Sequence, residues 1–196
     1  EIGPRILVNE FEKKLTGYLK VKYGIATSSA SSALHLILIC ADIKAGDEII
    51  IPSYYYSFIL DVISYVGAIP VLADINADDY NVNFENLKSK MTEKTKAIII
   101  PHTFGLPADI NQLRETGKIL IEDCSHSLGA EINGEKTGSA GDFSFFDFYP
   151  TRMITTGNGG FIVTKEKEAY DKIMDLVNFD EREDYKIRFA YRLSDM

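Results

Sequence analysis

Residues 45–75, AGDEIIIPSYYYSFILDVISYVGAIPVLADI, decide the fold of this chain. The runs at 49–51 and 70–73 are apolar and too short for helices, which predicts two buried strands. Residues 55–65, between these runs, have the apolar spacing of an amphipathic helix. A strand, a helix and a second strand in this order predict two parallel strands in one sheet, with the helix packed on that sheet.

The same alternation continues along the rest of the chain. Further buried strands are predicted at 97–100, 119–121, 143–146 and 161–163. Further helices are predicted at 5–22, 31–41, 84–91, 109–116 and 165–178, and several of them open with Ser, Asn or Asp caps. The pattern predicts an α/β fold in which a mainly parallel sheet lies between two layers of helices.

Composition and charge exclude several classes of function. The chain has 196 residues, 45% of them hydrophobic and 26% charged, as in ordinary globular proteins. Its formal net charge is −8 and its basic residues are dispersed. Contact with phosphate groups needs concentrated positive charge, so we expect neither a nucleic-acid interface nor an anionic-membrane surface.

The two cysteines, Cys40 and Cys124, lie in neither a CxxC motif nor a His/Cys grouping with metal-ligand spacing. We therefore expect no metal site and no disulfide scaffold. No apolar run is long enough to span a bilayer, and the N-terminus lacks the pattern of a signal peptide. These features predict a protein of the reducing cytoplasm.

Polar residues follow several of the predicted strands. Asp74 follows the strand at 70–73, His102 follows the strand at 97–100, and Glu122 and Asp123 follow the strand at 119–121. Ligands of open α/β sheets bind beyond the carboxyl ends of the strands, so these four residues are candidates for a site. The alternative for each residue is a polar loop without a functional role.

Several stretches of the sequence resemble one family in unbroken order. They are SSASSALHL (28–36), AGDEIIIPSYYYS (45–57), GAIPVLADI (67–75), TKAIIIPHTFG (95–105), LIEDCSHSLGAEINGEKTGSAGDFSFFDFYPTRMITTGNGGFIVT (120–164) and YRLSDM (191–196). The chain thus resembles the DegT/StrS sugar aminotransferases, fold-type I enzymes that use pyridoxal phosphate (PLP) or pyridoxamine phosphate (PMP) on nucleotide-linked keto sugars. The resemblance implies a three-layer large domain with a mixed, mainly parallel sheet of seven strands over residues 1–196. It also implies that the family's small C-terminal domain is absent.

The resemblance places Arg152 where the family has the lysine that forms a Schiff base with the cofactor. In the family that lysine follows Tyr-Pro-Thr, which here is Tyr149-Pro150-Thr151. A guanidinium stays protonated at physiological pH and is delocalised, so Arg152 cannot form the imine. Covalent attachment of the cofactor at this position is chemically excluded.

Three other positions of the implied cofactor pocket carry suitable residues. Asp123 matches the carboxylate that keeps the pyridine nitrogen protonated. His126 matches a position near the ring hydroxyl, and Tyr56 matches an aromatic residue that stacks on the ring. Without the resemblance, a capping Asp, a hydrogen-bonded His and a core Tyr would be sufficient explanations.

The implied phosphate site differs from the family. Ser29-Ala30-Ser31 replaces a Ser-Gly-Thr turn, and alanine adopts positive φ less readily than glycine, although Ser31 keeps a hydroxyl. Asp147 replaces a serine that donates to the phosphate, and an ionised Asp offers only acceptors. Ala190 replaces an asparagine that reaches the phosphate of the partner subunit in the family. Binding of the phosphate is therefore expected to be poor.

Three functions remain open from the sequence. The first is a non-catalytic or regulatory homologue, a homodimer or the partner of an active aminotransferase subunit, with a nucleotide sugar as a possible ligand. The second is a transaminase or dehydratase of nucleotide keto-sugars that holds PLP or PMP without a covalent lysine. The third is a fragment without an independent role. Whether Asp147 and Arg152 pair with each other is also open, because a spacing of five on a loop does not establish contact.

Overall fold

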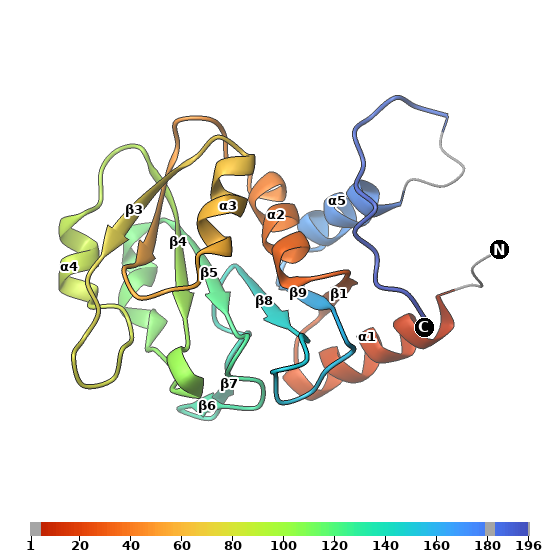
Figure 1. The fold of residues 1–196 in the computed structure, drawn as a ribbon, viewed down its shortest axis with the longest axis horizontal. Helices are drawn as coiled ribbons and strands as arrows, with labels where there is room; N and C mark the ends of the chain where they lie inside the picture. Colours follow the sequence, from red (N-terminus) through yellow and green to blue (C-terminus); the bar gives the residue numbers. More distant parts are fainter. Residues whose placement is uncertain (1–4, 179–182, 196) are drawn as a thin grey trace.

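A seven-stranded sheet is the centre of the molecule (Figure 1). The computed structural model describes residues 5–178 and 183–195. The strands of the sheet, in spatial order, are β1 (Tyr23–Thr27), β9 (Gly160–Thr164), β8 (Phe143–Asp147), β5 (Ile119–Asp123), β4 (Thr95–Pro101), β2 (Glu48–Pro52) and β3 (Ile69–Ala73). Strand β9 is antiparallel to both of its neighbours, and the other neighbouring pairs are parallel. A small hairpin, β6 (Glu131–Ile132) and β7 (Glu135–Lys136), lies outside this sheet.

Helices cover both faces of the sheet (Figure 1). On one face lie α2 (Ala30–Cys40), α3 (Phe58–Tyr65) and α5 (Lys167–Val177). On the other face lie α1 (Ile6–Leu19), α4 (Phe84–Ser89) and the 3-10 helix η2 (Ile110–Thr116), and a short 3-10 turn, η1 (Thr103–Gly105), follows β4. None of the described helices combines the length and the apolar composition needed to cross a membrane.

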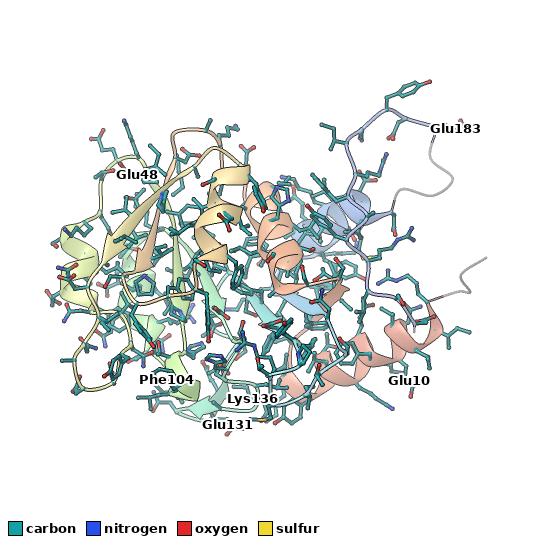
Figure 2. The ribbon with its side chains drawn as sticks, in the orientation of Figure 1. Glu10, Glu48, Phe104, Glu131, Lys136 and Glu183 are labelled. Carbon is teal, nitrogen blue, oxygen red and sulfur yellow. The ribbon has the colours of Figure 1, made fainter. Side chains whose placement is uncertain are left out.

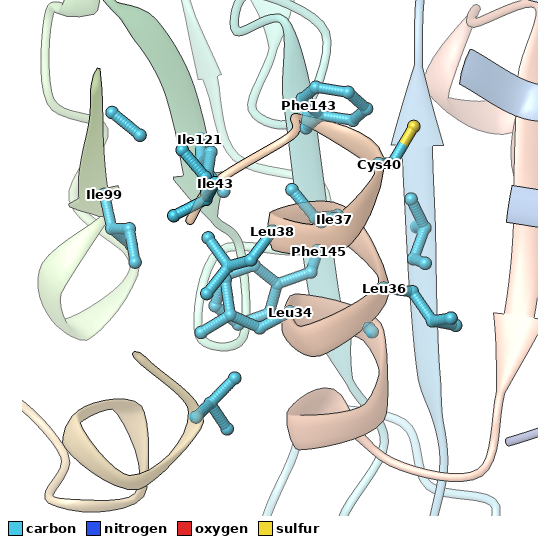
Figure 3. Close-up of a cluster of buried hydrophobic side chains, with 14 of the residues drawn as sticks. Leu34, Leu36, Ile37, Leu38, Cys40, Ile43, Ile99, Ile121, Phe143 and Phe145 are labelled. Carbon is cyan, nitrogen blue, oxygen red and sulfur yellow. The ribbon is translucent and has the colours of Figure 1, made fainter. Parts of the chain in front are cut away.

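Alternating side chains of the central strands enter two different cores. Ile99 and Ile121 pack under α2, whereas Ile98, Ile100 and Leu120 face the opposite layer. Figure 3 shows Leu34 and Leu38 of α2 beside Phe145 of β8 in the first of these cores. Successive residues of a strand point to opposite faces, so a strand covered on both sides must be apolar throughout. This is why the strands read as continuous apolar runs.

The predicted fold class is confirmed, with several local differences. Strand β1 was not predicted, because Gly24, Ala26 and Thr27 give a weak strand signal directly after a helix. Gly24 is required there, since a Cβ at this position would lie 2.3 Å from the Phe161 ring. The predicted helix at 109–116 is a 3-10 helix closed by Gly117 at φ 64°, and α3 begins at Phe58, three residues later than predicted.

The strand register places the last residues of β1 and β8 beside the first residue of β9. Thr27 of β1 pairs with Gly160 of β9, and Gly160 pairs with Asp147 of β8. The carbonyl of Ser29, the N-cap of α2, approaches Gly160 so closely that a Cβ there would lie 2.3 Å from its oxygen. The start of α2 and the end of β8 therefore lie at the same edge of the sheet, which is the edge that carries the candidate site.

Gly160→Ala is expected to lower the free energy of unfolding by about 1 to 3 kcal/mol, because the new methyl would overlap the backbone carbonyl of Ser29. Gly17→Ala is the matched control, since Gly17 lies inside α1 and a Cβ there has no neighbour within 4 Å. Removal of a helical glycine should stabilise the protein by up to about 1 kcal/mol. Urea denaturation of both variants tests this, and equal stabilities would contradict the packing at Gly160.

Candidate functional site

Side chains from four segments converge beyond the carboxyl ends of β5 and β8. Asp123 ends β5 and Asp147 ends β8. His126 follows β5 by three residues, Arg152 lies in the loop between β8 and β9, and Tyr56 precedes α3. The structure therefore brings five of the sequence-predicted positions together at one edge of the sheet, as parallel strands require.

Arg152 and Asp147 form an ion pair. The guanidinium Nε donates to Oδ2 of Asp147 at 2.6 Å, and the two side chains are 12% and 10% exposed. The other oxygen of Asp147, Oδ1, accepts from the backbone N–H of Tyr149 at 3.1 Å. Burial by itself lowers the pKa of Arg152, but the contacts with Asp147 and Tyr56 reverse this, so its pKa is raised and its charge is fixed. The sequence left open whether Asp147 and Arg152 pair, and the structure shows that they do.

His126 connects this ion pair to Tyr56. Its Nε2 contacts Nη1 of Arg152 and lies 2.9 Å from the hydroxyl of Tyr56. Because a guanidinium has donors only, Nε2 must be the acceptor and the proton of the neutral ring must lie on Nδ1. Burial and the neighbouring Arg152 lower the pKa of His126, which keeps the ring neutral. The guanidinium also lies over the Tyr56 ring, 5.4 Å from its centroid.

Asp123 is buried and held by two donors. The Tyr55 hydroxyl donates to Oδ2 at 2.8 Å, and the backbone N–H of Ser125 donates to Oδ1 at 2.8 Å. Burial and the charge of Asp123 raise the pKa of Tyr55 well above its ordinary value, so Tyr55 stays a donor. Neither Tyr55 nor Ser125 was predicted as a site residue. The sequence offers only a positional signal for each of them. Tyr55 adjoins Tyr56, and Ser125 lies two residues after Asp123, which is the spacing of an Asx turn.

Two cavities adjoin His126. One, of about 330 Å³, is lined by Asp147, Arg152 and Thr151. The other, of about 180 Å³, is lined by Asp123 and by the rings of Tyr54, Tyr55, Tyr56 and Phe104. His126, Ser125 and Phe104 line both cavities. The first cavity therefore has an ion pair in its wall, and the second has a carboxylate among aromatic rings.

The start of α2 corrects one expectation about Ala30. Ala30 is the first residue of this helix, so its φ is negative and no left-handed turn is needed. Ala30 is 5% exposed and packs in the core. The hydroxyl of Ser29 caps the helix by accepting from the N–H of Ser32 at 3.1 Å. Ser31 follows in the first turn, and its role at a phosphate stays a prediction.

Ala190 lies next to this edge within its own chain. It is exposed and precedes Tyr191, whose carbonyl accepts from the N–H of Ser28 at 2.7 Å. Arg192 forms a β-bridge with Thr27 at the end of β1. That Ala190 acts in the site of a partner subunit stays a prediction.

The remaining strand-end residues have structural roles. Glu122 accepts from Nε2 of His102 at 2.9 Å and from the backbone N–H groups of Gly138, Ala140 and Gly141. Burial opposes ionisation of Glu122, but the bond from His102 and these amides outweigh it and lower its pKa. Asp74 instead pairs with Asn86 of α4.

His102, Glu122 and Cys124 are also close enough together to share a metal ion. However, Nδ1 of His102 already accepts from the N–H of Ala108 at 3.0 Å, and Nε2 donates to Glu122. Burial raises the pKa of the Cys124 thiol well above its ordinary value, which disfavours the thiolate that a metal requires. These three side chains are better explained as a satisfied polar cluster in the core.

Comparison with known proteins agrees with this geometry. The model of the DegT/DnrJ/EryC1/StrS aminotransferase family matches residues 3–195. The chain belongs to this family. GDP-perosamine synthase of Vibrio cholerae is 38% identical over 175 residues, which cover 87% of this chain and 48% of that protein. The chain spans about half the length of the curated relatives it matches.

Solved structures show the same fold. A DegT/DnrJ/EryC1/StrS aminotransferase from Brucella abortus superposes with a TM-score of 0.88 at 30% identity, covering 98% of this chain and 56% of that one. Spr1654 of Streptococcus pneumoniae, known in PLP and PMP forms, gives 0.89 at 28% identity, with coverages of 98% and 56%. The dehydratase ColD, solved with GDP-perosamine, gives 0.81 at 28% identity, with coverages of 86% and 46%. The relatives of this chain therefore include nucleotide-sugar aminotransferases and a dehydratase.

The residues of this chain fit the family's cofactor at one end only. At the ring end, Asp123 is a buried carboxylate, and Tyr56 and His126 lie beside it. At the other end, Arg152 cannot form an imine, and Asp147 presents a carboxylate where the resemblance to the family places phosphate donors. The charge-neutral Asp147–Arg152 pair gives no net attraction for a dianion. The site therefore does not fit a covalently bound phosphate ester.

Glu122→Gln is expected to destabilise the protein by about 1 to 3 kcal/mol, because an amide nitrogen would face buried donors that now reach a carboxylate. Glu131→Gln is the control, since the carboxylate of Glu131 is half-exposed and pairs only with Lys136. Loss of an exposed pair should change the unfolding free energy by about 1 kcal/mol or less. Similar unfolding free energies for the two variants would contradict a buried anion at Glu122.

Acidification is expected to destabilise the protein through His126. The pKa of His126 is lowered from its ordinary value of 6.5, so just below that pH the unfolded chain binds more protons than the folded chain. This contribution to the unfolding free energy is complete above 6.5 and is lost as the pH falls toward the lowered pKa. His126→Gln, which keeps an acceptor for Arg152, should show a flatter dependence between about pH 5 and 8 in urea titrations. An identical pH dependence of the unfolding free energy in wild-type protein and His126→Gln would contradict the role of His126.

Proposed function

We propose that this chain is a non-catalytic or regulatory homologue of the nucleotide-sugar aminotransferases. The observation that carries this proposal is the ion pair of Arg152 with Asp147, 2.6 Å long and nearly buried, at the position of the family's Schiff-base lysine. Arg152 therefore occupies this position in a part-buried pair, in which each partner compensates the charge of the other. Position 152 therefore carries no amine that could perform the covalent step of the family's chemistry.

The family's ligands and partners enter this proposal as well. A nucleotide sugar is the proposed ligand, because the relatives include a GDP-perosamine synthase and a dehydratase solved with GDP-perosamine. A second copy or an active aminotransferase subunit is the proposed partner, and the cytoplasm is the proposed location.

The test is restoration of covalent cofactor binding. Wild-type protein should show no saturable change in its absorbance spectrum on titration with PLP, and no mass increase after borohydride reduction. The triple variant Asp147→Ser, Arg152→Lys and Ala190→Asn restores the amine and two phosphate donors, and it should gain the mass of one reduced cofactor. Arg152→Lys alone is the control and should bind PLP more weakly than the triple variant, because Asp147 remains.

A saturable spectrum and a covalent adduct in the wild-type protein would overturn the proposal. A triple variant that folds but stays cofactor-free would show that the pocket differs in shape as well as in chemistry. Thermal unfolding of each variant distinguishes this result from a failure to fold.

A second function is favoured by the retention of Asp123, Tyr56 and His126 at the ring end. These residues could hold PMP without a covalent bond, for a transaminase or dehydratase reaction on a nucleotide keto-sugar. His126 is the proposed proton acceptor, since Arg152 stays protonated and is a poor base. Turnover of a keto-sugar with added PMP, absent in His126→Phe, would establish this function and replace the first.

A further inference from the structure

Another cavity lies at the opposite edge of the sheet from the candidate site. It has a volume of about 340 Å³ and is lined by residues 114, 117–120, 140 and 142. Residues 118 and 142 directly precede β5 and β8, so the cavity lies at the amino ends of strands whose carboxyl ends carry the candidate site. In Figure 2, Glu48 at the start of β2 and Phe104 beside the candidate site lie on these two opposite edges.

Three cationic side chains border this cavity. Arg114 and Lys118 line it. The carbonyl of Ala140, another lining residue, accepts from Nη2 of Arg114 at 3.0 Å and from Nζ of Lys165 at 2.6 Å. One backbone oxygen thus holds a guanidinium and an ammonium close to each other. Burial and the neighbouring Arg114 lower the pKa of Lys165, as expected where a second cation lies close by.

Glu122 fixes the loop on which these cations converge. Its buried carboxylate accepts from three N–H groups of the segment 138–141, among them that of Ala140. The amide of Ala140 is therefore bound inside the protein, while its carbonyl receives Arg114 and Lys165. Arg114 is held a second time, because its Nε donates to an asparagine of the same 3-10 helix at 2.7 Å. The fold thus preorganises the two cations.

The charges at the cavity favour an anionic ligand. Arg114, Lys118 and Lys165 form no salt bridge with any residue that the structure describes. Asp142 is the one carboxylate of the lining, and its Oδ2 already accepts from a backbone N–H of β5 at 2.8 Å. Two further carboxylates attract Lys165 from outside the lining. Three cations against one lining carboxylate are a local excess of positive charge in a chain whose net charge is −8.

A phosphate group matches this excess better than a carboxylate does. A phosphate monoester carries about −1.5 to −2 charge at neutral pH and offers three strong acceptor oxygens. A guanidinium and ammonium groups are the side chains that bind such oxygens. A single carboxylate would leave part of the positive charge uncompensated.

We propose that this cavity binds the phosphate group of a small molecule, at a site separate from the candidate site at the other edge of the sheet. Arg114 and Lys118 donate to the phosphate oxygens, and Lys165 adds its charge beside Ala140. Oδ1 of Asp142 can accept from a hydroxyl of the ligand, so both free phosphate and the phosphate ester of a sugar fit the site. The inference goes beyond the proposed function and does not depend on it, because none of these residues lines the cavities beside His126.

The test is a titration of the full chain with inorganic phosphate, glucose 1-phosphate and glucose, followed through the backbone amide signals in NMR spectra. Both phosphate compounds should shift the signals of Gly117, Lys118 and Ala140 in a saturable way, and glucose should not. Tighter binding of glucose 1-phosphate would identify a phosphate ester as the ligand. Equal or weaker binding of the ester would identify free phosphate.

Lys118→Gln and Lys13→Gln are a matched pair, because each removes one positive charge. Lys118 lines the cavity, whereas Lys13 is exposed on α1 outside it. Lys118→Gln should weaken phosphate binding by about fivefold, the worth of one charge pair at about 4 Å in bulk water. Lys165→Gln should act in the same direction, and Lys13→Gln should leave the affinity unchanged. Equal effects of Lys118→Gln and Lys13→Gln would overturn the proposed site, and thermal unfolding checks that each variant folds.

The location of the shifted signals separates this inference from the proposed function. Absence of saturable shifts at Gly117, Lys118 and Ala140 would overturn the inference and leave the proposed function standing. Saturable shifts confined to His126 and Arg152 would overturn the inference and count against the proposed function as well, since the phosphate would then occupy the family's pocket.

Discussion

Burial of the central strands on both faces is the constraint on which the rest of the structure depends. The interior strands β5 and β4 put consecutive residues into opposite cores, so the central positions 97–100 and 119–121 are apolar. The carboxylates of the interior strands lie where β5 and β8 reach their ends. Asp123, Asp147 and Glu122 all lie at that boundary, and the parallel direction of β5 and β8 brings the first two to the same edge. The position of the site is therefore a consequence of the sheet.

Electrostatics at this edge differ between its two ends. At the end nearest β8, Asp147 and Arg152 neutralise each other, and Arg152 also fixes the tautomer of His126. At the end nearest β5, Asp123 keeps its carboxylate among aromatic rings and a free serine hydroxyl. A phosphate group finds no net positive charge at the first end, whereas the second end keeps a carboxylate that can accept hydrogen bonds. This division agrees with the non-catalytic function that we propose.

Much of this arrangement could be predicted from the sequence, and the exceptions have physical causes. Strand β1 was missed because its weak strand formers are held by pairing with β9, which is remote in sequence. The conformational argument about Ala30 was wrong because this residue begins a regular helix and packs in the core. Tyr55 and Ser125 were missed because a phenol and a serine have no distinctive pattern until the fold places them on Asp123.

The sequence by itself determined the α/β fold, the family and the absence of an amine at position 152. These follow from local periodicity, motif order and the chemistry of a guanidinium, none of which needs coordinates. Only the tertiary structure decided that Asp147 and Arg152 pair, that His126 accepts from Arg152, and that His102 and Glu122 are structural. The reason is that each of these contacts depends on distances between segments that strand order and register bring together.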